Sequence, residues 1–437
     1  MGGVAGLDRS NEEWLRDPAI WKPLPEPDLW DDGCRAYQAD SSKLSFPRLE
    51  WETCGEGCER ADLVQGYGFA AANALSSHER NGSNSAFLQI SNIIQNDPYK
   101  GMEIHRIIDL RGGDTIAAMK IESPGPEIML DAKCIAESYT VTSAFQAFVA
   151  VIFGKGESSK TLYGGFDAER KRWTWQLPSR KHFECVETTY LEAGGGGQWF
   201  AICDTPPVVR ALLTPGSSDV SSIVETKGEW IPRIPTSFGD LVIWSEVEKA
   251  RSGSRIRGYG VSDGLRLRTV LGHLPGDVCA LSMSSTHLAG TLGNGASCNL
   301  YQKDARFWSV PRDAGPAAPV SLSPVLYNGL LTFWNSASNG DFVATTMTDN
   351  DGNWAFVLAR TQDWTIRYLP KDWPAWFAMD SKYLYLMATR RDKYAERVKE
   401  VRRYDLGMFE RIGAPYEGVL LDPAVLCDLY PCHGEEW

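Results

Sequence analysis

The stretches LVIW at residues 241–244 and YGVSDGLRLRTV at residues 259–270 decide the fold of this chain. The first is a short apolar run, which is typical of a buried β-strand. The second places Asp263 and Gly264 between two strand-like segments, and Asp-Gly is a strong signal for a tight hairpin turn. Together they predict a unit of consecutive antiparallel strands within about 40 residues.

The same unit recurs along the chain. Apolar runs begin at residues 86, 147, 199, 241, 288, 330 and 383, at intervals of 42 to 61 residues, and read AFLQI, AFVAVIF, WFAIC, LVIW, LAGTL, LLTFW and YLYLM. Each is followed by a turn, and these turns are centred on Asp109, Asp167, Pro215, Asp263, Asp304, Asp351 and Asp405. Self-similarity at such a period indicates a repeat architecture in which neighbouring units bury one another's faces.

Through this repeat the chain resembles the β-propeller superfamily over nearly its whole length. The Gly-His and Trp-Asp pairs of WD40 repeats and the double glycines of kelch repeats are missing, so no narrower family is indicated. The resemblance implies an all-β, seven-bladed β-propeller of four-stranded antiparallel blades. We expect residues 1–60 to form an N-terminal arm with possible ring-closing strands and residues 61–437 to form the propeller. Either chain end could complete the last blade.

Composition narrows the class of partner. The formal net charge is −12 and the isoelectric point is about 5.1, which argues against nucleic acid as a ligand. No apolar stretch reaches the roughly 18 residues that a transmembrane helix needs. We therefore expect no membrane-spanning segment.

Ten cysteines predict disulfide bonds and export. Their spacing suggests Cys54 with Cys58, Cys185 with Cys203, Cys279 with Cys298, Cys427 with Cys432 and, less directly, Cys34 with Cys134. Disulfides persist in oxidising compartments, so we expect a periplasmic or extracellular location. The sequence MGGVAGLDRSNEEW at the N-terminus lacks the features of a signal peptide, and any export signal is expected to lie outside this sequence.

Candidate ligand-binding residues follow from their position relative to the strands. Polar residues that precede five of the apolar runs could form a ring at one mouth of the propeller: Gln146, Gln198, Asp240, His287 and Lys382. Trp244 and Trp334 end two of the runs, where they could stack on a sugar or anchor a partner on the opposite face. A structural role is the simpler interpretation of both sets: a turn position for the polar residues and core packing for the two tryptophans.

No motif for a metal, a cofactor or a catalytic nucleophile is present, so we expect no metal and no cofactor, and an enzyme is the less favoured hypothesis. The leading hypothesis is an exported binding or scaffold protein that recognises a protein or glycan through loops on one face. The alternative is a carbohydrate-active hydrolase or lyase with an axial site, whose paired carboxylates sequence alone cannot identify.

Overall fold

A computed structural model describes most of the β-strands of this chain. It describes residues 17–23, 35–39, 48–63, 69–80, 83–94, 102–122, 134–141, 147–153, 160–167, 172–176, 188–194, 198–204, 207–212, 220–225, 230–238, 241–248, 253–260, 266–293, 305–326, 329–349, 354–371, 376–391 and 397–418. These residues form seven antiparallel sheets.

Five of the sheets are blades of four consecutive strands, ordered from the inner to the outer edge. The first two comprise β9 (Cys134–Val141), β10 (Ala147–Phe153), β11 (Lys160–Asp167) and β12 (Arg172–Gln176), then β13 (Thr188–Gly194), β14 (Gln198–Asp204), β15 (Pro207–Leu212) and β16 (Val220–Glu225). The next two comprise β17 (Trp230–Phe238), β18 (Leu241–Glu248), β19 (Ser254–Gly260) and β20 (Arg268–Leu274), then β21 (Asp277–Met283), β22 (His287–Gly293), β23 (Arg306–Pro311) and β24 (Ser321–Leu322). The fifth comprises β25 (Gly329–Ser338), β26 (Phe342–Asp349), β27 (Trp354–Arg360) and β28 (Ile366–Lys371), with β32 (Ala414–Pro415) added at its outer edge.

The other two sheets combine distant parts of the chain. One contains β5 (Phe69–Arg80), β6 (Ser83–Ile94), β7 (Met102–Asp109) and β8 (Thr115–Glu122), extended by β2 (Arg35–Ala39) and β1 (Trp21–Pro23). The other contains β29 (Phe377–Met379), β30 (Tyr383–Arg391) and β31 (Arg397–Asp405), completed by β4 (Cys58–Asp62) and β3 (Glu52–Gly55). The expectation of seven uniform four-stranded blades is therefore corrected: five regular blades are present.

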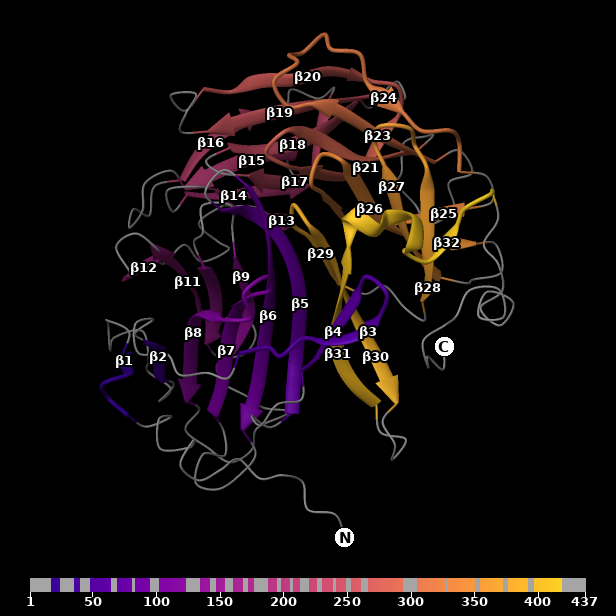
Figure 1. Cartoon of the computed structure of the whole chain (residues 1–437). Coiled ribbons are helices and arrows are strands. Elements are labelled where there is room, and N and C mark those ends of the chain that lie inside the picture. The colour runs from indigo at the N-terminus through magenta and orange to yellow at the C-terminus, as the bar shows by residue number, and fades with distance from the viewer. Residues whose placement is uncertain are drawn as a thin grey trace.

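The sheets follow one another around a common axis, which gives a β-propeller (Figure 1). Innermost strands of neighbouring sheets are in contact, as for β13 with β17, β17 with β21, β21 with β25 and β25 with β29. The first and last sheets meet where β29 contacts β5. The propeller expected from the sequence repeat is confirmed.

The hydrophobic core lies between successive sheets. Phe200, Trp244 and Tyr259 pack between the β13–β16 and β17–β20 sheets. Leu88 and Tyr385 belong to the cluster that joins the first sheet to the last. Short runs that are apolar at consecutive positions suit this arrangement because each sheet has a neighbour on both faces. The apolar runs of the sequence therefore become the strands.

Six of the seven apolar runs lie on the second strand of their sheet. The run at Leu330 is the exception, because it lies on the innermost strand β25 and the second strand is β26. Four of the seven turns connect third and fourth strands. The turns at Asp304 and Asp351 instead fall between second and third strands, and Asp405 precedes the 3-10 helix η7 (Leu406–Arg411).

The N-terminal segment completes the last sheet. Strand β4 pairs with β31 from Asp62 opposite Glu400 to Cys58 opposite Tyr404. The C-terminal strand β32 pairs with β28 and so belongs to the preceding blade. The boundary at residue 60 falls within β4. Of the two chain ends that the sequence left open, the N-terminal one supplies the closing strands.

One predicted disulfide is confirmed. Cys54 and Cys58 are bonded, with 5.2 Å between their Cα atoms, and close the β3–β4 hairpin. Cys203 and Cys279 also take part in disulfides. Cys34, Cys185, Cys298, Cys427 and Cys432 lie outside the described residues, and Cys134 is described only as the start of β9. Within the described ranges, no helix is long and apolar enough to cross a membrane.

We expect non-reducing peptide mapping to recover the pairs Cys185–Cys203 and Cys279–Cys298. The reason is local: Cys203 pairs with Thr188, which is only three residues along the chain from Cys185. Recovery of Cys203 or Cys279 linked to any other cysteine would contradict the assignment.

Candidate functional site

Two kinds of turn lie at the same end of each antiparallel sheet. The turn from the first strand to the second and the turn from the third to the fourth share one end, because strand direction alternates along the sheet. We call the end of the propeller that carries these turns the turn face. In the last two sheets its described parts are residues 339–341, 361–365, 380–382 and 406–411.

A groove lies on the turn face between the β25–β28 sheet and the last sheet. It has a volume of about 470 Å³ and is lined by residues from both walls, including Asp341, Arg360, Ser381, Lys382 and Asp405. A second hollow of about 390 Å³ continues from it along η7 and shares Phe342 and Arg360 with it. Phe342 packs partly buried on the core between the two sheets, so the floor is apolar and the walls are charged.

Asp380 anchors one wall of the groove. It follows β29, and its residue is only 1% exposed. One carboxylate oxygen accepts hydrogen bonds from the backbone N–H groups of Lys382 and Tyr383, at 2.6 and 2.7 Å, which closes the turn into β30. The other oxygen accepts from the Tyr385 hydroxyl at 3.0 Å and from Arg111 Nε at 3.1 Å. The buried charge is thus fully hydrogen-bonded, which offsets its desolvation.

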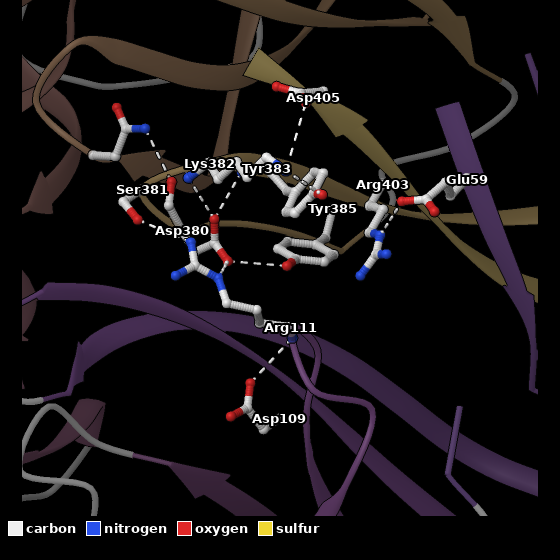
Figure 2. Close-up of polar contacts among 11 residues, drawn as sticks. Glu59, Asp109, Arg111, Asp380, Ser381, Lys382, Tyr383, Tyr385, Arg403 and Asp405 are labelled. Atoms are coloured by element: carbon white, nitrogen blue, oxygen red, sulfur yellow. Dashed lines mark hydrogen bonds and ion pairs between the residues drawn. The ribbon is translucent and has the colours of Figure 1, made fainter. Parts of the chain in front are cut away.

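Arg111 brings the first sheet to this wall. It lies in the β7–β8 turn and points at Asp380 (Figure 2), and its second contact is Nη2 to the Ser381 hydroxyl at 2.9 Å. The backbone N–H of Arg111 donates to Asp109 Oδ1, which holds the β7–β8 turn. Burial and the Asp380 carboxylate both raise the pKa of the Tyr385 hydroxyl, so Tyr385 remains a proton donor to Asp380 at neutral pH.

Arg360 lies on the opposite wall with its donors already engaged. Its Nε and Nη2 bind both carboxylate oxygens of Asp363, and its Nη1 binds Glu410 at 2.9 Å. Hydrogen bonding to Arg360 holds the pKa of Asp363 far below its usual range. Arg360 therefore fixes the shape of the groove wall by joining the β27–β28 turn to η7.

Lys382 is the cation with spare donors in the groove. Its Nζ donates to the Tyr383 hydroxyl at 2.7 Å and lies 3.8 Å from Asp405 Oδ2. The bond to Tyr383 is the main cause that raises the pKa of Lys382, so the amine stays charged. An ammonium carries three N–H donors, and the Lys382 side chain is 54% exposed. It can bind an acceptor group of a ligand in the groove.

The predicted ring of polar residues is partly described. Gln146 and Asp240 lie outside the described residues. Gln198 begins β14, His287 begins β22 and Lys382 directly precedes β30, so these three occupy equivalent places at the turn face. His287 Nδ1 lies 3.0 Å from the Thr286 hydroxyl, within the β21–β22 turn. A shared ligand for the ring stays a prediction.

The two tryptophans do not support the opposite face as a site. Trp244 is fully buried between two sheets, and its indole N–H donates to Glu246 within the core. It cannot stack on a ligand, which corrects that prediction. Trp334 is described only as part of β25. Strand β25 continues past Trp334 to Ser338, and the β25–β26 turn at residues 339–341 lies on the turn face, together with His287 and Lys382.

Sequence reasoning missed Asp380, Arg111 and Arg360. Arg111 and Asp380 are 269 residues apart in the chain, so no local spacing connects them. Within the described residues no three His, Cys, Asp or Glu side chains are grouped to hold a metal ion. The arrangement supports binding of a polar ligand, since charged donors and acceptors surround an apolar floor.

Comparisons with known proteins found distant structural likenesses. No protein-family model matches the chain, and no curated protein matches it. Among solved structures, a prolyl endopeptidase from a study of two such enzymes is similar over 73% of this chain, with 10% identity and a TM-score of 0.45. The chain spans 46% of that structure, about half its length.

Two further structures are covered almost completely. The β-propeller domain of the Trilobed protease from Pyrococcus furiosus, described as having an open velcro topology, matches 77% of this chain and 96% of its own, with 10% identity and a TM-score of 0.44. The polysaccharide lyase Uly1 matches 82% of this chain and 100% of its own, with 10% identity and a TM-score of 0.42. At such identity these likenesses concern the fold alone.

Replacing Asp380 by Ala should lower the free energy of unfolding by about 2–4 kcal/mol, because the buried Tyr385 hydroxyl and two turn N–H groups lose their acceptor. Urea denaturation measures this directly. Arg111→Met should cost less, about 1 kcal/mol, since the arginine is half exposed and its attraction to Asp380 is screened. An unfolding midpoint of Asp380→Ala equal to that of the wild type would contradict the anchoring role.

Proposed function

We propose that this chain is an exported binding propeller that recognises a protein or glycan through the groove on the turn face. The observation that carries the proposal is the groove itself, with Lys382 exposed and Asp405 half-buried beside an apolar floor. Such a site offers donors, acceptors and a surface for aliphatic or ring contacts at once. Peptides and oligosaccharides both present this mixture.

The rigidity of the walls supports recognition. Arg360 is tied to two carboxylates, and Asp380 is tied to four donors, so a ligand does not have to order these side chains when it binds. Preorganisation of this kind lowers the entropic cost of association. Lys382 keeps exposed donor capacity and is the residue that we expect to contact the ligand first.

We infer that the two composite sheets serve as the first and last blades, so that the ring has seven. Export is supported by the disulfide at Cys54 and Cys58 and by the bonded state of Cys203 and Cys279. The periplasm and the cell exterior both meet this requirement.

Replacing Lys382 by Ala should weaken binding of groove ligands at least about tenfold, the effect of losing roughly 1.4 kcal/mol of charge-assisted hydrogen bonding. The probes are a panel of immobilised neutral and acidic oligosaccharides and a displayed random-peptide library, and the readout is the Kd of the best binder for each variant. Lys382 is exposed, so the melting temperature should hold.

Trp376→Ala is the matched control for this experiment. Trp376 is 50% exposed and precedes β29, whereas Asp380 follows β29, so Trp376 marks the opposite end of the same sheet. Its replacement should leave the Kd unchanged. Equal Kd values for Lys382→Ala and wild type, with a loss for Trp376→Ala, would place recognition on the opposite face.

One observation favours the alternative of an axial hydrolase or lyase. Asp277 begins the innermost strand β21 and is 1% exposed. Burial raises its pKa, and this effect outweighs the nearby charge of Arg233 and the hydrogen bond from the Gly253 backbone, both of which lower it. A carboxylic acid with a raised pKa is suited to general acid catalysis.

Asp277 also yields a test of stability against pH. Because its pKa is higher in the folded chain than in the unfolded one, the folded chain holds the proton more tightly, and its stability falls as pH rises between the two values. Asp277→Asn should remove this loss, so its free energy of unfolding should depend less on pH than that of the wild type and should be higher at pH 7. Unfolding at pH 3–8 measures it; a variant less stable than wild type at pH 7 would contradict the buried charge.

A further inference from the structure

The first hairpin of the propeller projects beyond its own sheet. Strands β5 and β6 pair as far as Arg80 opposite Ser83. The neighbouring strand β7 pairs with β6 only as far as Phe87 opposite Asp109. Residues 77–80 of β5 and 83–86 of β6 lie on the tip side of that pair. They therefore extend past the turn face of the first sheet.

The projecting part crosses the ends of other blades in order. Nearest the base, the Ser77 hydroxyl accepts a hydrogen bond from the backbone N–H of Met379 in the last sheet, at 2.6 Å. Nearer the tip, Asn84 Nδ2 donates to the Ser338 carbonyl at the end of β25, at 2.6 Å. Asn84 Oδ1 accepts from the backbone N–H of Ser285 in the β21–β22 turn, at 3.2 Å. The hairpin thus contacts three successive blades.

Such a path leads across the axis of the ring. Strand β5 belongs to the first sheet, yet it also contacts β17, the innermost strand of a blade across the ring from it. Asn84 is 5% exposed, and both ends of its amide are used by other sheets. Because the Asn84 side chain hydrogen-bonds the backbone of two other blades, it bridges them to the first sheet.

The hairpin also holds the turns that form the groove. Ser338 is two residues before Gly340 and three before Asp341, which lines one wall. Met379 directly precedes Asp380, which anchors the other wall. Asn339 Nδ2 then joins the two walls through the Asp380 carbonyl, at 2.9 Å. Both walls are therefore fixed, through their backbone, to one hairpin.

We propose that the β5–β6 hairpin is a strap that covers the axis on the turn face and sets the spacing of the groove walls, with Ser77 and Asn84 as its positioning residues. The proposal rests on the groove as the binding site and adds how that site is controlled. A ligand arriving at the turn face meets the groove between two blades, while the axis beneath the strap is reached from the other face.

Hydrogen–deuterium exchange tests the strap without any ligand. Asn84→Ala should speed exchange of the Ser285 amide roughly tenfold, because that N–H loses its acceptor. Ser77→Ala should do the same for the Met379 amide, and Ser77→Thr, which keeps the hydroxyl, should restore protection. Ser323→Ala is the matched control: Ser323 accepts from the Phe307 N–H at 2.9 Å within one blade, so only that amide should change.

The Kd of the best oligosaccharide or peptide probe then measures whether the strap affects binding in the groove. Asn84→Ala should raise the Kd for that probe about tenfold while Ser323→Ala leaves it unchanged. Unchanged exchange at Ser285 and Met379, or faster exchange spread evenly over all sheets, would overturn the strap. Faster local exchange with no probe bound by the wild type would leave the strap standing and refute the groove as a binding site, so the two failures are distinct.

Discussion

The closing of the ring by β4 is the constraint on which the rest of the structure depends. In the five regular blades the strands follow one another along the chain, so each sheet forms from local contacts. The last sheet has only three local strands and takes its outer two from a segment more than 300 residues away. Pairing at such separation costs chain entropy that the contacts made there must offset.

Those contacts are stronger than ordinary strand pairing. Arg403 Nε binds Glu59 at 2.6 Å across the β31–β4 pair, and the Arg403 guanidinium stacks 4.2 Å from the ring of Trp51. The Gly57 carbonyl accepts a hydrogen bond from the backbone N–H of Asp405. Gly57 itself has a positive φ of 74°, a backbone conformation that suits glycine. The Cys54–Cys58 disulfide holds the β3–β4 hairpin in shape before it docks, which reduces the entropy lost on docking. Closure and the groove share this region, because Asp405 belongs to both.

The sequence predicted the repeat because each blade repeats the same local physics. Six apolar runs became second strands, and Asp263 lies in the chain between β19 and β20, the third and fourth strands of their blade. The prediction went wrong where local physics is ambiguous. Leu330 starts a run as apolar as the others, but β25 is ten residues long and its neighbour β26 is hardly less apolar, so hydrophobicity alone does not rank the two strands. Trp244 was misplaced because the apolar run ends there while strand β18 continues to Glu248, so Trp244 lies in mid-strand and is buried between two sheets.

The candidate site was hidden for a different reason, which the turns make clear. Ser284, Asn339 and Asp380 all occupy the first turn of their blades, and each accepts a backbone N–H two or three residues later. Locally the three are interchangeable turn residues. A hydroxyl has little acceptor capacity left after this task, whereas a carboxylate has a second oxygen. Asp380 uses that oxygen for Arg111 and Tyr385, and Asn339 uses its amide nitrogen for the Asp380 carbonyl. The turn chemistry is therefore legible in the sequence, but Arg111 reaches the second oxygen of Asp380 only when the ring closes and brings the first sheet against the last.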